Sequence, residues 1–475
     1  MVAPSPLRLW CTPLTTRRGR PKHTDAESRT MGRVSDIPRS GAARTAKLAS
    51  LPIGFAGRTA AGWGKRLAGR SSDEVGAELS AKTAEQLFAV LGELKGGAMK
   101  FGQALSVFEA AIPEEFAEPY REALTKLQSS APPMPAATVH RVLAEQLGTG
   151  WRERFSSFND EHAAAASIGQ VHRAVWQDGR EVAVKIQYPG AGEALRSDLR
   201  QLQRFGRMFQ AVIPGLQVRP LITELRERME EELDYRAEAD NQRAFAAAYD
   251  GNDEFLVPKV VASAPKVIVS EWIDGAGLAT IIANGSTAQR NEMGRRLALF
   301  HFSSPARAGL LHSDPHPGNY MLLPDGRMAV IDFGAVARLP DGLPHTFGRM
   351  TRLALDNRPE ELMTLLRREN FVEPDTELDP HEVLDYLRPF IEPMRAETFH
   401  FTRRWMQQQA ERLGDVRSAD FQLTRALNLP AQYLLVHRVT LGSIGILCQL
   451  DAEAPFKAIV EQWQPGMAAE PDEQV

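Results

Sequence analysis

The sequence predicts an α+β fold with two lobes, and three observations support this prediction. Apolar residues at helical spacing precede residue 150, several β-prone runs and an inserted pair of charged helices lie between about 155 and 275, and helical spacing resumes from Thr287. A small strand-rich lobe followed by a larger helical lobe leaves a cleft between them, and such clefts commonly hold ligands.

The predicted segments follow these changes of texture. They are a disordered basic arm at 1–45, a helical extension at 46–150, a strand-rich lobe with inserted helices at 151–275, a helical lobe at 276–463 and an acidic tail at 464–475. In the extension, Pro135 suits the first position of a helix and Gly148 suits its end.

The composition is ordinary for a globular chain, with 43% hydrophobic and 24% charged residues among 475. A net charge of −4 makes no demand for a nucleic-acid partner, and we expect none. The two cysteines, Cys11 and Cys448, form no CxxC pair, so neither a disulfide scaffold nor a zinc site is expected. These features favour a reducing, cytoplasmic setting.

The N-terminal region is basic: residues 1–70 hold fourteen Lys/Arg and three Asp/Glu. Residues 1–30 show no apolar period and are predicted to be disordered, and both a transit-like peptide and a translation start at Met31 fit them. The basic stretch 44–70 is either a mobile arm or a peripheral contact with an anionic membrane surface. No stretch provides the ~20 apolar residues of a membrane-spanning helix, since Val439–Leu450 has only twelve.

The strand-rich lobe is predicted from short β-prone runs and one hairpin signal, Asp178-Gly179. In the run Glu181–Ile186, the alternation places Val182, Val184 and Ile186 on one face and Lys185 on the other. Further strands are expected at Ser167–Trp176, Leu256–Val261 and Val267–Ser270, and charged helices at 193–213 and 221–249.

The strongest chemical signal is His312-Ser313-Asp314-Pro315-His316-Pro317-Gly318-Asn319, followed by Ile331-Asp332-Phe333-Gly334. Residues 321–331 contain a hairpin signal at Pro324-Asp325-Gly326 that would join the two parts. Phosphoryl transfer needs carboxylate and amide ligands for magnesium and a carboxylate that orients the attacking group. Asn319 and Asp332 would hold magnesium, Asp314 would be the base, and His312 would pack the loop.

The upstream half of the sequence fits the same chemistry. Val182-Ala183-Val184-Lys185 matches a strand pattern in which the lysine contacts the α- and β-phosphates of ATP. Ser270-Glu271-Trp272-Ile273 after a strand is a candidate hinge whose backbone would meet adenine. An acidic run, 230–238, supplies candidate carboxylates to anchor the lysine. On one continuous helix Asp234 and Glu238 would stack, whereas Glu232 would face another side.

From about Leu79 to Leu450 the chain resembles the UbiB-type (AarF-like) atypical kinases. The motifs that carry this resemblance are Lys100-x-Gly102-Gln103, the alanine-rich loop Ala164-Ala165-Ala166-Ser167, Glu232-x-Asp234, Glu238, and the two motifs of the helical lobe described above.

The resemblance implies a protein-kinase-like fold whose N-terminal helical extension is packed over the active-site cleft. It also implies that Lys100 and Gln103 act at the site, that Lys100 faces the Glu232-x-Asp234 carboxylates, and that Glu238 is the partner of Lys185. The alanine-rich loop and Ala183 would line the nucleotide. ATP or ADP and magnesium are the implied cofactors, and lipid or quinone intermediates are the implied partners.

Three functions remain open on sequence alone. The first is an ATP-hydrolysing atypical kinase that supports isoprenoid quinone or lipid metabolism. The second is a small-molecule phosphotransferase of the aminoglycoside or choline kinase type. The third is a non-catalytic nucleotide-binding scaffold, favoured by alanines where kinases use glycines, because alanine resists positive φ and close approach to phosphate. The oligomeric state is not predicted.

Overall fold

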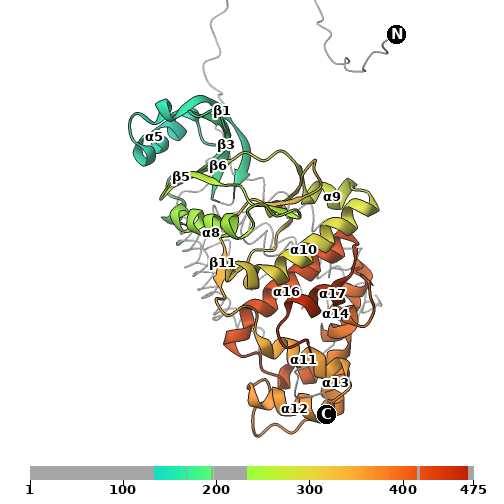
Figure 1. Cartoon of the computed structure of the whole chain (residues 1–475). Helices are drawn as coiled ribbons and strands as arrows, with labels where there is room; N and C mark the ends of the chain where they lie inside the picture. Colours follow the sequence, from blue (N-terminus) through green and yellow to red (C-terminus); the bar gives the residue numbers. More distant parts are fainter. Residues whose placement is uncertain (1–132, 167, 194–195, 197–232, 415–417, 469–475) are drawn as a thin grey trace, which may run out of the picture. The chain divides into compact units, whose positions relative to one another are not determined.

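Alternating apolar residues and turn residues build an antiparallel sheet in the first lobe, and Figure 1 shows its strands β1, β3, β5 and β6. The computed structural model describes residues 133–166, 168–193, 196, 233–414 and 418–468. The described part combines a strand-rich lobe with a helical lobe, which confirms the two-lobed α+β prediction. The predicted arm at 1–45, and the predicted extension up to residue 132, lie outside the described residues.

The first sheet has the strand order β1-β2-β3-β6-β5, and all its neighbouring strands run antiparallel. The predicted hairpin at Asp178-Gly179 joins β2 to β3. The bounds of these strands are β1 (Phe155–Ala166), β2 (Gly169–Trp176), β3 (Glu181–Gln187), β5 (Val260–Ala264) and β6 (Val267–Glu271).

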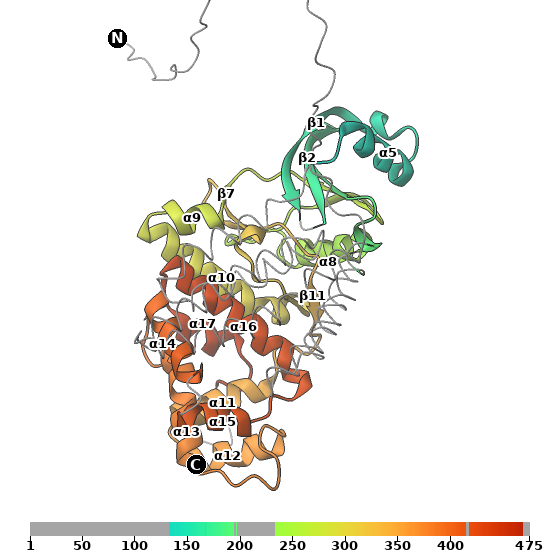
Figure 2. The ribbon, with the colours of Figure 1, turned by 180° about the vertical axis from the view of Figure 1, so that it is seen from behind.

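Two helices cover opposite faces of this sheet. The fully buried Val182, Val184 and Ile186 of β3 pack with helix α5 (Ala136–Leu147) in one apolar cluster. On the other face Ile268 of β6 packs with Ala239 of helix α8 (Tyr235–Ala248). The alternation of β3 therefore sends Lys185 to the face that α8 covers. Figure 2 shows α5 beside β1 and β2 from behind.

One close backbone approach in the sheet requires glycine. A Cβ on Gly169 would lie 2.2 Å from the carbonyl oxygen of Ile186, far inside a normal contact. Gly169 opens β2 and pairs with Gln187, so its missing side chain lets β3 come close at the strand end nearest Lys185.

Two small sheets carry the loops of the second lobe. One has the order β4-β10-β9-β7, and its β9 and β10 form the predicted hairpin around Asp325-Gly326. In the other sheet β8 and β11 pair antiparallel, with His312 opposite Val336. This pairing brings the chain before Ser313 next to the chain after Gly334. The bounds are β4 (Phe255–Leu256), β7 (Ala276–Gly277), β8 (Leu310–His312), β9 (Tyr320–Leu322), β10 (Met328–Val330) and β11 (Val336–Arg338).

The helical lobe is organised around helix α10, which a capping box at Ser286 begins and Gly309 ends. Helices α16 and α17 pack against α10, and Figure 1 shows the three together. The helices are α9 (Leu278–Asn284), α10 (Thr287–Ala308), α11 (His345–Leu355), α12 (Pro359–Arg368), α13 (Pro380–Ile391), α14 (Arg403–Gly414), α15 (Ala419–Ala426), α16 (Ala431–Leu450) and α17 (Phe456–Trp463).

Shorter elements complete the described chain. The 3-10 helices are η2 (Trp151–Arg154), η3 (Pro317–Asn319) and η4 (Glu392–Met394). The short strands β12 (Phe399–His400) and β13 (Glu453–Ala454) pair with each other.

Helix α16 corrects the expectation that its apolar stretch is too short to cross a membrane. The twelve residues from Val439 belong to a twenty-residue helix of mean hydropathy 1.3, which among the described helices is long and apolar enough to span. In its most apolar stretch, 56% of the residues are buried, and the helix packs against α10. A place in the core of the helical lobe therefore accounts for the apolar character of α16.

Four further expectations are corrected. The strand β1 was not predicted, because its exposed outer residues break the apolar alternation. The inserted helix expected at 221–249 begins at Tyr235 within the described residues. Asp234 lies before that helix and not on it. The tail expected from residue 464 begins later, because Gln464 and Met467 are buried against the helical lobe.

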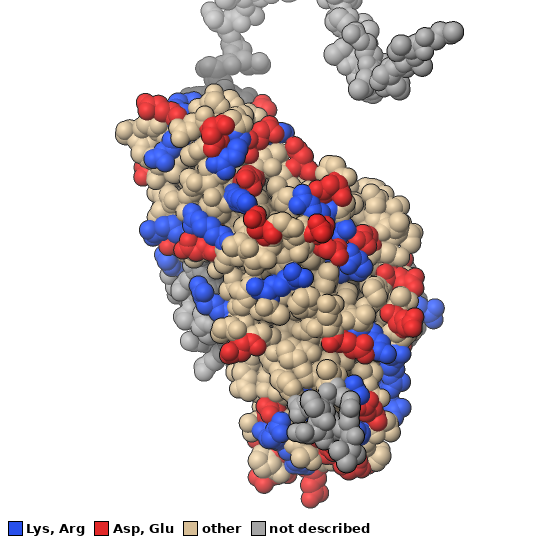
Figure 3. Space-filling view, viewed as in Figure 1, with Lys and Arg blue, Asp and Glu red and all other residues tan. Residues whose placement is uncertain are grey.

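Charges of both signs are interspersed over the face shown in Figure 3. Many described ion pairs are partly exposed, such as those of Glu254 with Arg295 and Arg296. Surface pairs of this kind contribute little stability one by one.

Candidate active site

Lys185 joins three segments that are distant in the sequence. Its ammonium Nζ lies 2.7 Å from Glu238 Oε1 on α8 and 2.9 Å from Asp332 Oδ2, which follows β10. Its side chain is 13% exposed, that of Glu238 5% and that of Asp332 32%. The predicted lysine, its expected partner and a predicted metal ligand therefore meet at one place.

The two carboxylates set the charge state of the lysine. Burial alone would lower the pKa of Lys185, but Asp332 and then Glu238 outweigh it and raise that pKa well above its ordinary value. A lysine whose pKa is raised on folding stabilises the fold below its ordinary pKa and loses that contribution only as the pH passes the raised value. The ammonium therefore stays charged across the neutral range.

The aromatic ring of Tyr235 also faces the ammonium, with Lys185 Nζ 5.1 Å from the ring centroid. Such a cation–π contact favours the charged lysine. Tyr235 is the first residue of α8 and is fully buried. Asp234 caps this helix by accepting from the backbone N–H of Arg236, so the capping aspartate fixes where Tyr235 and Glu238 lie.

The loop from Asp314 to Asn319 is held by its own hydrogen bonds. The Asn319 side-chain Nδ2 donates to the Asp314 carbonyl at 2.9 Å, and the Ile331 backbone N–H donates to the Asn319 carbonyl at 3.0 Å. Burial, and to a lesser degree the nearby charge of Asp314, raises the pKa of the Tyr320 hydroxyl. The candidate base and both candidate metal ligands are thus on adjoining segments.

His312 ties this loop to Asp332. Its Nε2 donates to the Asp332 carbonyl at 2.7 Å, which fixes the proton on Nε2 because a carbonyl only accepts. The ring is buried among Phe300, Tyr320 and Phe333. His312 therefore has the packing role that the sequence predicts.

Phe333 anchors the Asp332-Phe333-Gly334 turn in the core. It is fully buried, and its ring centroid lies 5.0 Å from that of Phe245 on α8. Asn241 Nδ2, also on α8, donates to the Phe333 carbonyl at 3.2 Å, and the Gly334 N–H donates to Asp332 Oδ1 at 3.0 Å. The helix that carries Glu238 thus also positions the turn that carries Asp332.

The residues present fit a magnesium ion. Magnesium takes oxygen ligands and is commonly bound by one or two carboxylates together with substrate phosphates. Asp332 supplies a carboxylate, and the bond from Asn319 Nδ2 to Asp314 leaves Oδ1 as the ligand atom of that amide. Neither residue belongs to a larger cluster of His, Cys, Asp and Glu, since the described chain contains no metal-binding group of three or more such residues.

The alanines expected to line the nucleotide lie on strands β1 and β3. Ala164, Ala165 and Ala166 do not form a loop: they end β1, paired with Val171, Gln170 and Gly169. This pairing continues the β1–β2 hairpin almost to its tip. Ala183 shares the Lys185 face of β3.

At the expected hinge, β6 ends at Glu271 and Ile273 follows in a loop. The backbone N–H of Glu271 donates to Lys259 and that of Trp272 to Glu181. A ligand at this strand end therefore cannot use those two N–H groups. Lys100, Gln103, Ser167 and Glu232 lie outside the described residues.

Sequence reasoning missed Tyr235 and Asn241 as parts of the site. No motif marks either residue, because each acts through a contact made across the fold. The position of Asn241 three residues after Glu238 is the one available signal, since residues three apart on a helix lie on neighbouring surfaces.

The family described as "ABC1 atypical kinase-like domain" matches residues 126–360. The chain is 32% identical over 314 residues to the mitochondrial atypical kinase COQ8B of Danio rerio, covering 64% of this chain and 50% of that protein. It is 31% identical over 322 residues to the chloroplastic protein ACTIVITY OF BC1 COMPLEX KINASE 3 of Arabidopsis thaliana, covering 66% and 44%. The chain thus spans about half the length of these relatives.

A solved structure is also similar. It is described as the complex of Rv3197 with erythromycin from Mycobacterium tuberculosis. The sequences are 54% identical, the TM-score is 0.65, and the match covers 84% of this chain and 100% of the other.

Proposed function

Because the chain belongs to the family of ABC1 (UbiB-type) atypical kinases, we propose that it binds ATP and cleaves its terminal phosphate in a magnesium-dependent reaction. The observation that carries this proposal is the meeting of Lys185, Glu238 and Asp332 beside the Asp314–Asn319 loop. A charged lysine next to a metal-binding carboxylate suits the polyanionic tail of a nucleotide.

Each residue of the site would have a distinct task. Lys185 would bind the α- and β-phosphates, and Glu238 would hold the lysine in place. Asp314 would orient or deprotonate the attacking group. Asp332 and Asn319 would hold magnesium, which neutralises phosphate oxygens during transfer. Lys185 and Asp332 lie 2.9 Å apart. When a magnesium nucleotide binds, Lys185 would turn to its phosphates and Asp332 to its magnesium.

We place this activity in isoprenoid quinone or lipid metabolism at a membrane surface. The resemblance to UbiB-type kinases supports this assignment. Two relatives are named as mitochondrial and chloroplastic proteins. Those names locate the relatives. For this chain we propose an intracellular protein that contacts an anionic membrane peripherally through its basic N-terminal region.

The test is phosphate release from ATP by the full chain, measured with and without magnesium and with and without vesicles containing anionic lipid. Asp332→Asn should lower the magnesium-dependent rate at least 100-fold. Asp325→Asn is the matched control, because the exposed Asp325 pairs with Arg327 in the β9–β10 turn, away from the site. Equal rates for Asp332→Asn and the unchanged chain would overturn the proposal. ATP binding without turnover under every condition would instead favour the scaffold function.

A second binding activity is supported by the similar structure described with erythromycin. At 54% identity over the whole of that chain, we propose that this protein also binds a macrolide. Isothermal titration with erythromycin tests this directly, and the absence of binding at millimolar concentration would contradict it.

A further inference from the structure

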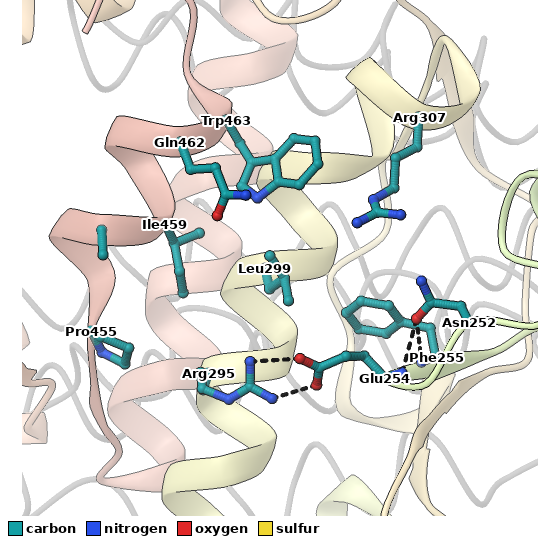
Figure 4. A pocket seen from close by; sticks show the side chains of 11 residues that line it. Asn252, Glu254, Phe255, Arg295, Leu299, Arg307, Pro455, Ile459, Gln462 and Trp463 are labelled. Atoms are coloured by element: carbon teal, nitrogen blue, oxygen red, sulfur yellow. Dashed lines mark hydrogen bonds and ion pairs between the residues drawn. The ribbon is translucent and has the colours of Figure 1, made fainter. Parts of the chain in front are cut away.

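A pocket of about 320 Å³ lies in the helical lobe, apart from Lys185 and Asp332. Its walls come from three places: the middle and end of α10, the helix α17, and the turn that follows α8. Figure 4 shows it from close by, with Trp463 and Arg307 on one side and the Arg295–Glu254 pair on another. A volume of this size is at the lower end for small-molecule sites.

Among the described residues, most charged side chains around the pocket are paired with each other, but the guanidinium of Arg307 is not. Glu254 pairs with Arg295 and Arg296, and Glu292 pairs with the same two arginines. These four charges cancel. Arg307 also lines the pocket, and it makes no ion pair with any residue that the structure describes.

Arg307 is exposed, and its guanidinium instead lies over two aromatic rings. Its guanidinium carbon lies 4.9 Å from the ring centroid of Trp463 and 5.8 Å from that of Tyr249. Stacking against rings fixes the plane of a guanidinium while leaving its N–H edge open to an anion. The arginine is therefore oriented in advance for a carboxylate.

The rest of the lining is mixed: Asn252 and Gln462 are polar, whereas several other residues are apolar. Phe255, Leu299 and Ile459 line the pocket. The indole Nε1 of Trp463 is buried, yet it has no hydrogen-bond partner among the described residues. A buried donor without a partner is costly.

We propose that this pocket binds a small planar carboxylic acid. Its carboxylate would pair with Arg307, and its apolar body would lie against Phe255, Leu299 and Ile459. The Glu254 carboxylate on the opposite wall favours a single negative charge over the double charge of a phosphate ester. This binding is independent of the proposed nucleotide chemistry.

The experiment is isothermal titration of the full chain with 2-naphthoate and with the neutral, similarly shaped 2-naphthamide. Naphthoate should bind at least tenfold more tightly than naphthamide, and Arg307→Gln should remove that difference. Arg388→Gln is the control, because Arg388 pairs with Asp385 on the surface of α13. Equal affinity for the two compounds, or unchanged naphthoate binding by Arg307→Gln, would overturn the proposal.

A second variant separates a lost site from a lost fold. Ala458 lines the pocket and is exposed, so Ala458→Phe should fill the pocket while leaving Arg307 and its ring contacts in place. We expect this variant to keep the unfolding temperature of the unchanged chain and to lose naphthoate binding at least tenfold. Full naphthoate binding by Ala458→Phe would show that the acid binds elsewhere and would refute the assignment.

Discussion

Lys185 on β3 and Asp332 after β10 lie 2.9 Å apart, although 147 residues separate them in the sequence. Lys185 also contacts Glu238 of α8, so one ammonium links the strand-rich lobe to the loop segments of the helical lobe. The contact depends on the pairing of β8 with β11, which holds the Asp314 loop against the turn at Phe333.

Replacing Lys185 with Met should destabilise the fold. Glu238 is only 5% exposed, and removing the ammonium beside a buried carboxylate typically costs about 3 kcal/mol. The free energy of unfolding at pH 8, from urea denaturation, measures the loss.

The double variant Lys185→Met with Glu238→Gln is the control for that prediction. It removes both charges, so it should recover part of the lost stability. A double variant less stable than Lys185→Met alone would show that the pair does not act as a buried ion pair.

Stability should fall between neutral pH and pH 4 because of His301. Burial, and to a lesser degree the nearby His312, lowers the pKa of His301 to about 4, while the unfolded value is 6.5. A group whose pKa is lowered on folding contributes stability above its unfolded pKa, and this is lost as the pH falls toward the folded value. The loss at pH 5 should be about 2 kcal/mol.

Urea unfolding of the unchanged chain and of His301→Gln at pH 7 and pH 5 measures this contribution. His301 Nε2 lies 3.1 Å from Thr440 Oγ1 on α16, a bond that a glutamine amide can partly replace. The variant should lose less stability than the unchanged chain on going to pH 5. The same pH dependence in both proteins would exclude His301 as the cause.

Replacing Gly169 with Ala should push β2 away from β3. The added Cβ would lie 2.2 Å from the Ile186 carbonyl oxygen, and backbone must move to relieve the overlap. Overpacking of this kind typically costs about 1–3 kcal/mol. Gly277→Ala is the control, because a Cβ there meets nothing within 4 Å. Thermal unfolding should show a lower midpoint for Gly169→Ala alone, and equal midpoints would contradict the argument.

Asn241→Ala should affect the magnesium dependence of the proposed turnover more than the stability. Its hydrogen bond to the Phe333 carbonyl contributes about 1 kcal/mol, but it also orients the turn that presents Asp332. We expect the magnesium concentration for half-maximal phosphate release to rise several-fold. Asn291→Ala removes a comparable bond, to the Glu453 N–H, and should leave that concentration unchanged. An equal effect of both variants would leave Asn241 with a structural role only.

Local signals in the sequence accounted for much of the fold and for the residues that meet at the site. The hairpin at Asp178-Gly179 and the one around Asp325-Gly326 follow from turn chemistry that operates over a few residues. The start of α10 at Thr287 follows from its capping residue Ser286, and the end of α5 from Gly148. Lys185 and Asp332 were identified because kinase-like spacing marks each of them within its own segment.

Only the tertiary structure decided the features that depend on contacts between distant segments. The strand β1 forms although its outer residues are polar, because pairing with β2 satisfies its backbone. Asp234 caps α8 and does not stack with Glu238, which helical periodicity alone could not distinguish. The contacts of Tyr235 with Lys185 and of Asn241 with Phe333 form only when α8 packs against the strands and the turn that carry those partners. The pocket around Arg307 forms only when α10 and α17 pack together. Sequence patterns report local periodicity, whereas these positions are set by packing free energy summed across the whole fold.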